Sequence, residues 1–228
     1  MMEPTYIFVH GAWHGAWCWR ELGREFDRRG VAWRAVDLPS AQPHGDPSAS
    51  LVDDVAALVA CTTVDEPIVL VGHSYGGVVI TEAAPQIPNL HRLCYLAALV
   101  PNVGQNTTET SRTVSVRTQL DAAIEVDGPL LRLNPEQVVG ALYQECSPEL
   151  QKWAAGQLSH QTLASFRSPR QASKVAVPSQ YILCRHDHAL DPSLQEQMSE
   201  RCDTLLELES DHSPYLSHPV ECADALLQ

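Results

Sequence analysis

The sequence predicts an α/β protein built on a mainly parallel six-stranded sheet that is flanked by helices. Short apolar runs alternate with helical patterns from the start of the chain, which is typical of βα units in a parallel sheet. The 228 residues are 44% hydrophobic and fit one domain with a substantial core. In addition, a glycine-rich turn joins the third apolar run directly to a helical run.

Six apolar runs are the strand candidates. They cover residues 6–10, 32–37, 68–72, 93–99, 180–184 and 205–209. Helical patterns cover residues 17–29 and 50–61 between the early runs. Ser50 is the expected N-cap of the second helix, with Asp53 at the capping-box position. The connections fit right-handed crossovers between parallel strands.

The regular alternation stops after Pro101. Residues 103–172 show no strand signal, only a threonine-rich lead-in and helical patterns at 135–146 and 148–158. A loop of that length would be unusual in a compact domain. We therefore expect a small helical cap at 103–172, inserted after the fourth strand, with the core formed by residues 1–102 and 173–228. Such an insertion would cover the carboxyl edge of the strands, where open α/β sheets bind ligands.

The charge balance argues against two classes of partner. The chain has 15 Lys and Arg against 28 Asp and Glu, a formal net charge of −13 at pH 7. A protein that holds nucleic acid by neutralising many phosphates needs the opposite balance. An anionic membrane surface is disfavoured for the same reason, so we expect neither partner.

Three features predict a cytoplasmic protein. No apolar run approaches the roughly 18 to 20 residues that span a bilayer. The N-terminus lacks the basic region of a signal peptide. The seven cysteines are odd in number, widely spread and without a CxxC pair, which is typical of reduced thiols.

The sharpest motif is GHSYGG at residues 72–77, a GxSxG pattern that lies between a strand candidate and a helical run. This is the context of a nucleophile elbow, in which small residues on both sides of Ser74 let the backbone turn sharply and leave Ser74 Oγ exposed. The N-terminus of the following helix favours an anion at this turn. The alternative is a βα turn whose serine only caps the helix.

A second motif, HGAWHGAW at residues 10–17, follows the first strand candidate. An acyl-transfer site needs two convergent backbone N–H groups, one just after the nucleophile and one from a loop after a neighbouring strand. Tyr75 and Ala12 are the expected donors, and Gly11 allows the backbone to approach closely. For the tryptophan side chains of this motif, packing at the sheet edge is the alternative interpretation.

A nucleophilic serine needs a histidine base and an orienting carboxylate, and this elbow places them in the chain order serine, acid, histidine. Asp187 follows the fifth strand candidate, and His212 follows the last. Asp191 and Asp211 are rival acids. Adjacent residues on an extended loop point apart, so Asp211 is a poor orienter for His212. Asp187 is therefore preferred, with Asp191 as the remaining alternative.

Other chemistries find weaker support in the sequence. His186 and His188 flank Asp187 in a pattern that metal sites use, but no third ligand is evident. The glycine-rich turn lacks the GKS or GKT of a phosphate loop. The first βα turn reads HGAWHG, which is not the GxGxxG of a dinucleotide site. We therefore expect no metal and no cofactor.

The chain resembles the α/β-hydrolase superfamily, and within it the small branch of plant methylesterases, hydroxynitrile lyases and bacterial carboxylesterases. The resemblance rests on four blocks in the family's order: FVHGAWHGAWCW, VLVGHSYGG, YILCRHDHALDPSLQEQM and ESDHSPYLSHP. It covers essentially the whole chain. It implies a catalytic triad of Ser74, Asp187 and His212, oxyanion donors from the Ala12 and Tyr75 N–H groups, and a helical cap over the pocket.

Two positions separate the chemistries within this branch. Hydroxynitrile lyases that resemble these esterases usually carry a threonine after the first histidine of the HG block and a lysine after the catalytic histidine. Here those positions hold Gly11 and Ser213. Without a cation beside the base, a cyanide leaving group lacks electrostatic stabilisation, so the sequence favours ester hydrolysis.

The expected function is hydrolysis of a small to medium carboxylic ester through an acyl-enzyme. Lyase, lactonase or amidase activity and a slowly hydrolysing ligand receptor are the alternatives, since the fold alone does not settle function. Trp13 and His160 are candidate substrate contacts. A small-molecule ester is the expected partner, and the protein is expected to be a monomer or a homodimer.

Overall fold

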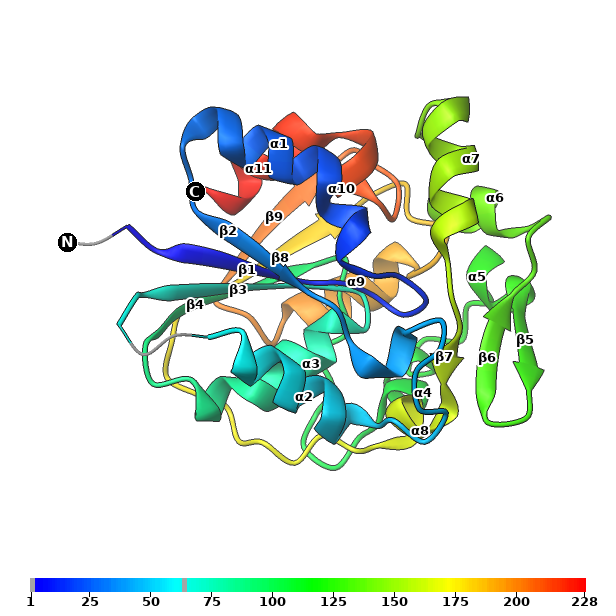
Figure 1. Cartoon of the computed structure of the whole chain (residues 1–228), viewed down its shortest axis with the longest axis horizontal. Coiled ribbons are helices and arrows are strands. Elements are labelled where there is room, and N and C mark those ends of the chain that lie inside the picture. Colours follow the sequence, from blue (N-terminus) through cyan, green and yellow to red (C-terminus); the bar gives the residue numbers. More distant parts are fainter. Residues whose placement is uncertain (1–2, 63–64) are drawn as a thin grey trace.

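A six-stranded parallel sheet forms the centre of the molecule (Figure 1). The computed structural model describes residues 3–62 and 65–228. The strands are β1 (Thr5–Val9), β2 (Trp33–Val36), β3 (Ile68–His73), β4 (Leu90–Leu96), β8 (Ser179–Cys184) and β9 (Thr204–Leu208). Their order across the sheet is β2-β1-β3-β4-β8-β9, and every neighbouring pair is parallel. The predicted fold class is confirmed, and each predicted strand is present.

Helices cover both faces of the sheet. In Figure 1, α1 and α11 pack together over one face, and α2 and α3 pack together over the other. The helices of the core are η1 (Ala16–Trp19), α1 (Arg20–Arg29), η2 (Pro39–Ala41), α2 (Leu51–Ala60), α3 (Gly76–Ala83), η3 (Ala84–Gln86), α9 (Pro192–Ser199), α10 (Pro214–Ser217) and α11 (Pro219–Leu226). The predicted capping box of α2 is present: Asp53 Oδ2 accepts hydrogen bonds from the Ser50 N–H at 2.7 Å and the Ser50 hydroxyl at 2.8 Å.

The central strands are buried on both faces. Every residue of β1 and β3 is buried, which explains why these strands appear in the sequence as continuous apolar runs rather than as alternating patterns. Aromatic rings fill the space between β1 and α1, where Phe8 stacks on Trp19 with ring centroids 4.9 Å apart. Burial of these large side chains is the main source of stability for the layer.

The insertion between β4 and β8 contains more than helices. Its elements are α4 (Thr107–Ser111), α5 (Gln119–Ala123), β5 (Ile124–Asp127), β6 (Leu130–Leu133), α6 (Val138–Leu142), α7 (Pro148–Gln157), β7 (Gln161–Thr162) and α8 (Leu163–Arg167). The prediction that this segment lacks strands is wrong, because β5, β6 and β7 form a small antiparallel sheet. Gly128 has a φ of 57° in the two-residue turn between β5 and β6. The turn residues are Gly128 and Pro129, and a glycine at the first turn position is a hairpin signal that the helical interpretation overlooked.

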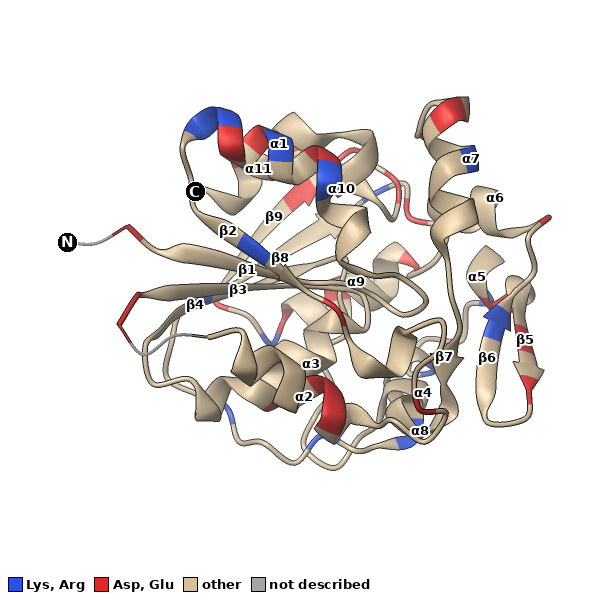
Figure 2. Cartoon of the chain, in the orientation of Figure 1, with Lys and Arg blue, Asp and Glu red and all other residues tan. Residues whose placement is uncertain are grey.

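Acidic and basic residues lie close together on the outer surface of α1 (Figure 2). Arg24 pairs with Glu21 at 2.9 Å, and Arg29 pairs with Glu25 at 2.7 Å. The Arg24–Glu21 pair is exposed and contributes little to stability, whereas the Glu25 side chain is buried. Among the described residues, no helix is long and apolar enough to cross a membrane.

Candidate active site

Ser74 occupies a sharp turn between β3 and α3. Its φ of 53° lies in the left-handed region that residues with a side chain rarely adopt. The neighbouring glycines make the turn possible: a Cβ on Gly72 would lie 2.6 Å from the Gly76 carbonyl oxygen, and a Cβ on Gly76 would lie 2.3 Å from the Val9 carbonyl oxygen. Only glycine fits both positions, so the backbone of the predicted elbow is present.

The turn leaves Ser74 accessible in otherwise buried surroundings. Of residues 68–81, all of which are described, only Ser74 is not buried. Its carbonyl oxygen accepts hydrogen bonds from the Gly77 N–H at 3.1 Å and the Leu99 N–H at 3.0 Å, which fix the backbone of the turn. The side chain therefore stands at the N-terminus of α3 on a rigid support, with the helix dipole favouring negative charge beside it.

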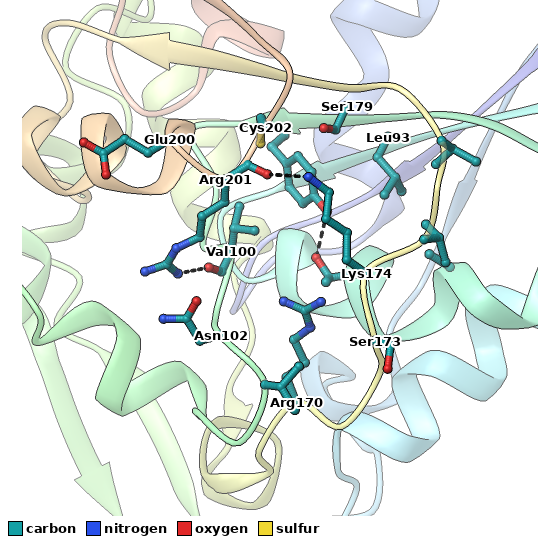
Figure 3. Close-up of a pocket in the computed structure, with 16 residues that line it drawn as sticks. Leu93, Val100, Asn102, Arg170, Ser173, Lys174, Ser179, Glu200, Arg201 and Cys202 are labelled. Atoms are coloured by element: carbon teal, nitrogen blue, oxygen red, sulfur yellow. Dashed lines mark hydrogen bonds between the residues drawn. The ribbon is translucent and has the colours of Figure 1, made fainter.

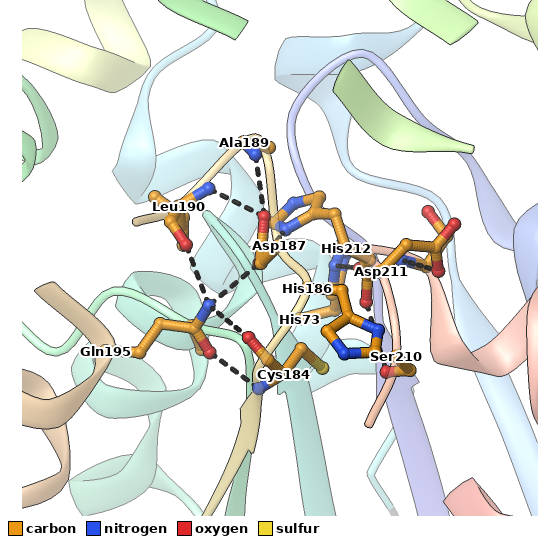
Figure 4. Close-up of polar contacts among 12 residues, drawn as sticks. His73, Cys184, His186, Asp187, Ala189, Leu190, Gln195, Ser210, Asp211 and His212 are labelled. Atoms are coloured by element: carbon orange, nitrogen blue, oxygen red, sulfur yellow. Dashed lines mark hydrogen bonds and ion pairs between the residues drawn. The ribbon is translucent and has the colours of Figure 1, made fainter. Parts of the chain in front are cut away.

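Asp187 and His212 form a buried pair at the carboxyl edge of the sheet (Figure 4). The His212 Nδ1–H donates to Asp187 Oδ2 at 2.7 Å. Both side chains are almost fully shielded, with 2% of His212 and none of Asp187 exposed. A carboxylate in this position fixes the imidazole so that Nε2 is the free basic nitrogen.

Other donors hold the Asp187 carboxylate in place (Figure 4). Its Oδ1 accepts the N–H groups of Ala189 at 2.7 Å and Leu190 at 2.8 Å. The Gln195 side chain of α9 donates to Oδ2 at 2.9 Å and also to the Leu190 carbonyl at 2.8 Å. Gln195 was not anticipated from the sequence, where a buried glutamine on a helix gives no distinguishing pattern.

The two rival acids have other roles in the structure. Asp191 is the N-cap of α9, and its Oδ1 accepts the Ser193 N–H at 2.9 Å. Asp211 Oδ1 accepts the Ser217 hydroxyl at 2.7 Å and the Ser213 N–H at 3.1 Å. Neither acid is bonded to His212, so the geometry pairs that histidine with Asp187.

A hydrogen bond ties the His212 loop to the elbow. The His73 Nε2–H donates to the His212 carbonyl at 2.8 Å, and the two rings have centroids 4.5 Å apart. Burial lowers the pKa of His73 well below its usual range, so this ring is neutral near pH 7. Because His73 directly precedes Ser74, this contact ties the backbone of the His212 loop to the residue before the nucleophile candidate.

The HGAW loop lies against the elbow from the other side. A Cβ on Gly11 would lie 2.9 Å from Ser74 Cβ, so the loop backbone is in van der Waals contact with the serine. Within the described residues, the N–H groups of Ala12 and Tyr75 donate to no protein acceptor. They are therefore free to bind an anion beside Ser74, as an oxyanion hole requires.

A buried polar network connects the two loops that carry these N–H groups. The Tyr75 hydroxyl donates to Asp54 Oδ2 at 2.7 Å, and the Ser40 hydroxyl donates to the same oxygen at 2.6 Å. Gln161 of β7 donates to Ser40 Oγ at 2.7 Å and accepts the Trp13 N–H at 3.3 Å. Desolvation raises the pKa of Asp54. This network could not be predicted from the sequence, since its members are far apart along the chain.

The two candidate substrate contacts lie in different surroundings. The Trp13 side chain is buried, and its indole N–H donates to the Leu131 carbonyl of β6 at 3.0 Å, so it anchors the insertion to the core. His160 is also buried and lines a cavity of about 320 Å3 together with Arg132 and Leu158, which Ser74 does not line. Contact of either residue with substrate stays a prediction.

The histidines beside Asp187 bind other partners. His186 Nδ1 lies 2.7 Å from Glu145 Oε1, and His188 Nδ1 lies 3.1 Å from the Gly140 carbonyl. Among the described residues, the side chains of Glu145, Asp211 and His218 could share a metal ion, since their ligand atoms lie within 4.8 Å of one another. The carboxylate oxygens of Glu145 and Asp211 already accept hydrogen bonds from backbone N–H groups, from the Ser217 hydroxyl or from His186.

A parallel sheet with a residue in left-handed conformation at a sharp strand–helix turn, faced by a buried histidine–carboxylate pair, defines the class of α/β hydrolases. A model of the alpha/beta hydrolase family matches residues 6–225, and the chain belongs to that family.

Several relatives of this chain are esterases. It is 29% identical to methylesterase 18 of Arabidopsis thaliana over 258 residues, which covers 100% of this chain and 97% of that protein. It is 26% identical to polyneuridine aldehyde esterase of Rauvolfia serpentina over 254 residues, with coverage of 99% and 95%. The crystal structure of a pyrethroid hydrolase from Sphingobium faniae JZ-2 has the same fold, with a TM-score of 0.85, 23% identity and coverage of 99% and 96%. The chain is thus a member of an esterase-type hydrolase family.

Proposed function

We propose that the protein is a serine carboxylesterase in which Ser74 is the nucleophile, His212 the general base and Asp187 the orienting carboxylate. The observation that carries this proposal is the buried hydrogen bond of 2.7 Å between His212 and Asp187, on a loop tied to the residue preceding Ser74. A base held in one tautomer beside an accessible serine is the arrangement that activates a hydroxyl.

The reaction proceeds in two half-reactions. His212 Nε2 takes the proton of Ser74 as Oγ attacks the ester carbonyl, and the tetrahedral intermediate places its negative oxygen on the Ala12 and Tyr75 N–H groups. The alcohol leaves with the proton from His212. Water then gives a proton to His212 and attacks the acyl-serine, which releases the acid and restores Ser74. Asp187 stabilises the imidazolium in both halves.

Two features of the site favour hydrolysis over cyanohydrin cleavage. Ser213, which follows the base candidate, is neutral, and its hydroxyl lies 3.1 Å from the Tyr215 hydroxyl. Gly11 has no space for a threonine, because even a Cβ would lie 2.9 Å from Ser74 Cβ. The position where a cation would stabilise leaving cyanide therefore holds a hydroxyl group instead.

The proposed substrate is a small to medium carboxylic ester, and the mechanism requires neither metal nor cofactor. The names of the relatives, a methylesterase and a polyneuridine aldehyde esterase, support this class. A cytoplasmic location is part of the proposal. It is supported by the free thiols of all seven cysteines, Cys18, Cys61, Cys94, Cys146, Cys184, Cys202 and Cys222, which fit a reducing compartment.

Covalent labelling tests the assignment of the nucleophile. An aryl fluorophosphonate should phosphonylate one serine, and mass spectrometry of the digested protein should locate the adduct on the peptide that contains Ser74. The His212→Ala variant should react far more slowly, since the serine then has no base. An adduct on another residue would reassign the nucleophile. Cleavage of mandelonitrile without hydrolysis of p-nitrophenyl esters would favour the lyase alternative.

A further inference from the structure

A second cavity lies away from Ser74, between α3 and the end of α9 (Figure 3). Its volume is about 350 Å3, within the range of small-molecule sites. Thr81 in the last turn of α3 and Ala84 directly after that helix line it, whereas Ser74 precedes the opposite end of α3. None of the proposed catalytic residues contributes to its walls, so the cavity is separate from the candidate active site.

Three cationic side chains, Arg170, Lys174 and Arg201, line this cavity. Their hydrogen bonds to other described residues go to backbone carbonyl groups, apart from a contact of Arg201 with the Met198 sulfur. No carboxylate of the described residues forms an ion pair with any of the three. Figure 3 shows that Glu200, which also lines the cavity, directs its carboxylate away from Arg170 and Lys174.

Arg170 is the central group of this cluster. Only 8% of the residue is exposed, and its guanidinium donates to the Pro101 carbonyl at 2.5 Å and the Ala172 carbonyl at 3.1 Å. Its backbone is also held in place, since the Arg170 N–H donates to the carbonyl of residue 105 and the Arg170 carbonyl accepts the N–H of residue 104. Two carbonyl groups leave several of the five guanidinium N–H donors without a partner among the described residues. A buried guanidinium without a counter-ion is costly, so the site favours an anion.

The charges of the cluster reinforce one another. Burial, and then the positive charge of Arg170, lower the pKa of Arg201. Like charges that share a cavity repel, and an anion between them removes this repulsion while it gains charge-assisted hydrogen bonds.

The remaining wall of the cavity is largely apolar. Leu93 and Tyr95 are two residues apart on β4 and so point to the same face. Val100, Val175 and Val177 add further apolar surface to the lining. A bare inorganic ion would leave this surface in contact with water. A ligand that joins one negative group to an apolar body satisfies both halves of the cavity.

We propose that this cavity binds a monocarboxylic acid with a short apolar tail, the carboxylate held by Arg170 with Lys174 and Arg201 nearby, and the tail packed on Leu93, Val175 and Val177. The planar carboxylate matches the guanidinium fork of Arg170. The proposal is independent of the esterase assignment, because it names a site that the catalytic residues do not share.

Isothermal titration calorimetry with sodium octanoate tests the proposal. The wild-type protein should bind octanoate, and neutral octanamide should bind at least about tenfold more weakly, a difference of about 1.4 kcal/mol. Val177→Glu, which introduces a carboxylate into the lining, and Lys174→Gln should each weaken octanoate binding. Arg117→Gln is the matched control, because Arg117 is exposed and does not line the cavity.

Arg170→Gln should give the largest loss, and circular dichroism will show whether that variant keeps its fold. Since an esterase also binds acids at its active site, the titration is repeated on protein whose Ser74 has been phosphonylated, which blocks the active site and should leave binding at the second site unchanged. No heat of binding up to about 10 mM octanoate, where even millimolar affinity would be detected, would overturn the proposal. Equal binding of octanamide, or unchanged binding by Val177→Glu and Lys174→Gln, would also overturn it.

Discussion

Glu145 and Asp211 each accept a hydrogen bond from the backbone N–H of the other. The Glu145 N–H donates to Asp211 Oδ2 at 3.1 Å, and the Asp211 N–H donates to Glu145 Oε2 at 3.2 Å. Glu145 belongs to the insertion, and Asp211 directly precedes His212. The reciprocal pair therefore fastens the insertion to the loop that carries the proposed base.

Loss of this fastening should destabilise the protein. In Asp211→Asn the amide NH2 cannot accept a hydrogen bond from one of the N–H groups. We therefore expect the free energy of unfolding to fall by about 1.5–3 kcal/mol, the usual contribution of a hydrogen bond to a charged group. Urea unfolding followed by circular dichroism measures this change. Glu149→Gln, a change at an exposed residue of α7, should leave the urea midpoint of unfolding unchanged. Equal midpoints for Asp211→Asn and the wild type would show that the pair contributes nothing.

Gln195 should act as a positioning residue for Asp187. In Gln195→Ala the carboxylate loses one of its donors, and the loss of a charge-assisted hydrogen bond should lower kcat about 10- to 100-fold. KM should change little, because the Gln195 side chain bonds to Asp187, Cys184 and Leu190 and to no residue of the elbow. The pH profile of kcat should shift, since the partner of the His212 imidazolium is held less firmly. Gln197→Ala, on the same helix, is the control, and a kcat equal to that control would refute the assignment.

The network through Gln161 should hold the Ala12 and Tyr75 N–H groups at a fixed distance and orientation relative to each other. Gln161→Ala removes the bonds to Ser40 and to the Trp13 N–H, and we expect kcat/KM for p-nitrophenyl butyrate to fall about tenfold, as for a lost buried hydrogen bond. The exposed Gln157→Ala on α7 serves as the comparison variant. A Gln161→Ala enzyme with full activity would mean that the loops keep their geometry unaided.

The buried histidines predict that acid weakens the fold. Burial lowers the pKa of His10 to about 4 and of His14 to about 3, below the ordinary value of 6.5. Between pH 6.5 and the lowered pKa, each of these histidines is protonated in the unfolded chain but neutral in the folded protein. The free energy of unfolding should therefore fall as the pH drops below about 6.5, by up to about 1.4 kcal/mol per pH unit for each histidine. Urea titrations between pH 7 and 4.5 measure the slope. His14→Gln should flatten it, whereas the exposed His91→Gln should not.

The sequence predicts the core of the fold because its signals are local. Strands such as β1 and β3 are buried on both faces and stand out as short apolar runs. The hairpin at 124–133 could not be predicted from its strands, because they are short and mostly exposed. The glycine of the Gly128–Pro129 turn is its main local signal.

The candidate site divides in the same way. Ser74, Asp187 and His212 lie at strand ends, where chain order and turn chemistry indicate them. Gln195, Asp54 and Gln161 could not be predicted, because they have partners up to 148 residues away and only the folded chain brings them together. A buried polar residue on a helix resembles any other until its hydrogen bonds are visible.

The most direct test of the account compares hydrolysis of p-nitrophenyl butyrate by the wild type and by Ser74→Ala at neutral pH. With Ser74 as the nucleophile, we expect turnover by the wild type and a loss of several orders of magnitude in kcat for the variant, because only substrate binding and oxyanion stabilisation remain. The variant should unfold at a similar urea concentration. A folded Ser74→Ala protein with wild-type kcat would contradict the central claim that this serine is the nucleophile.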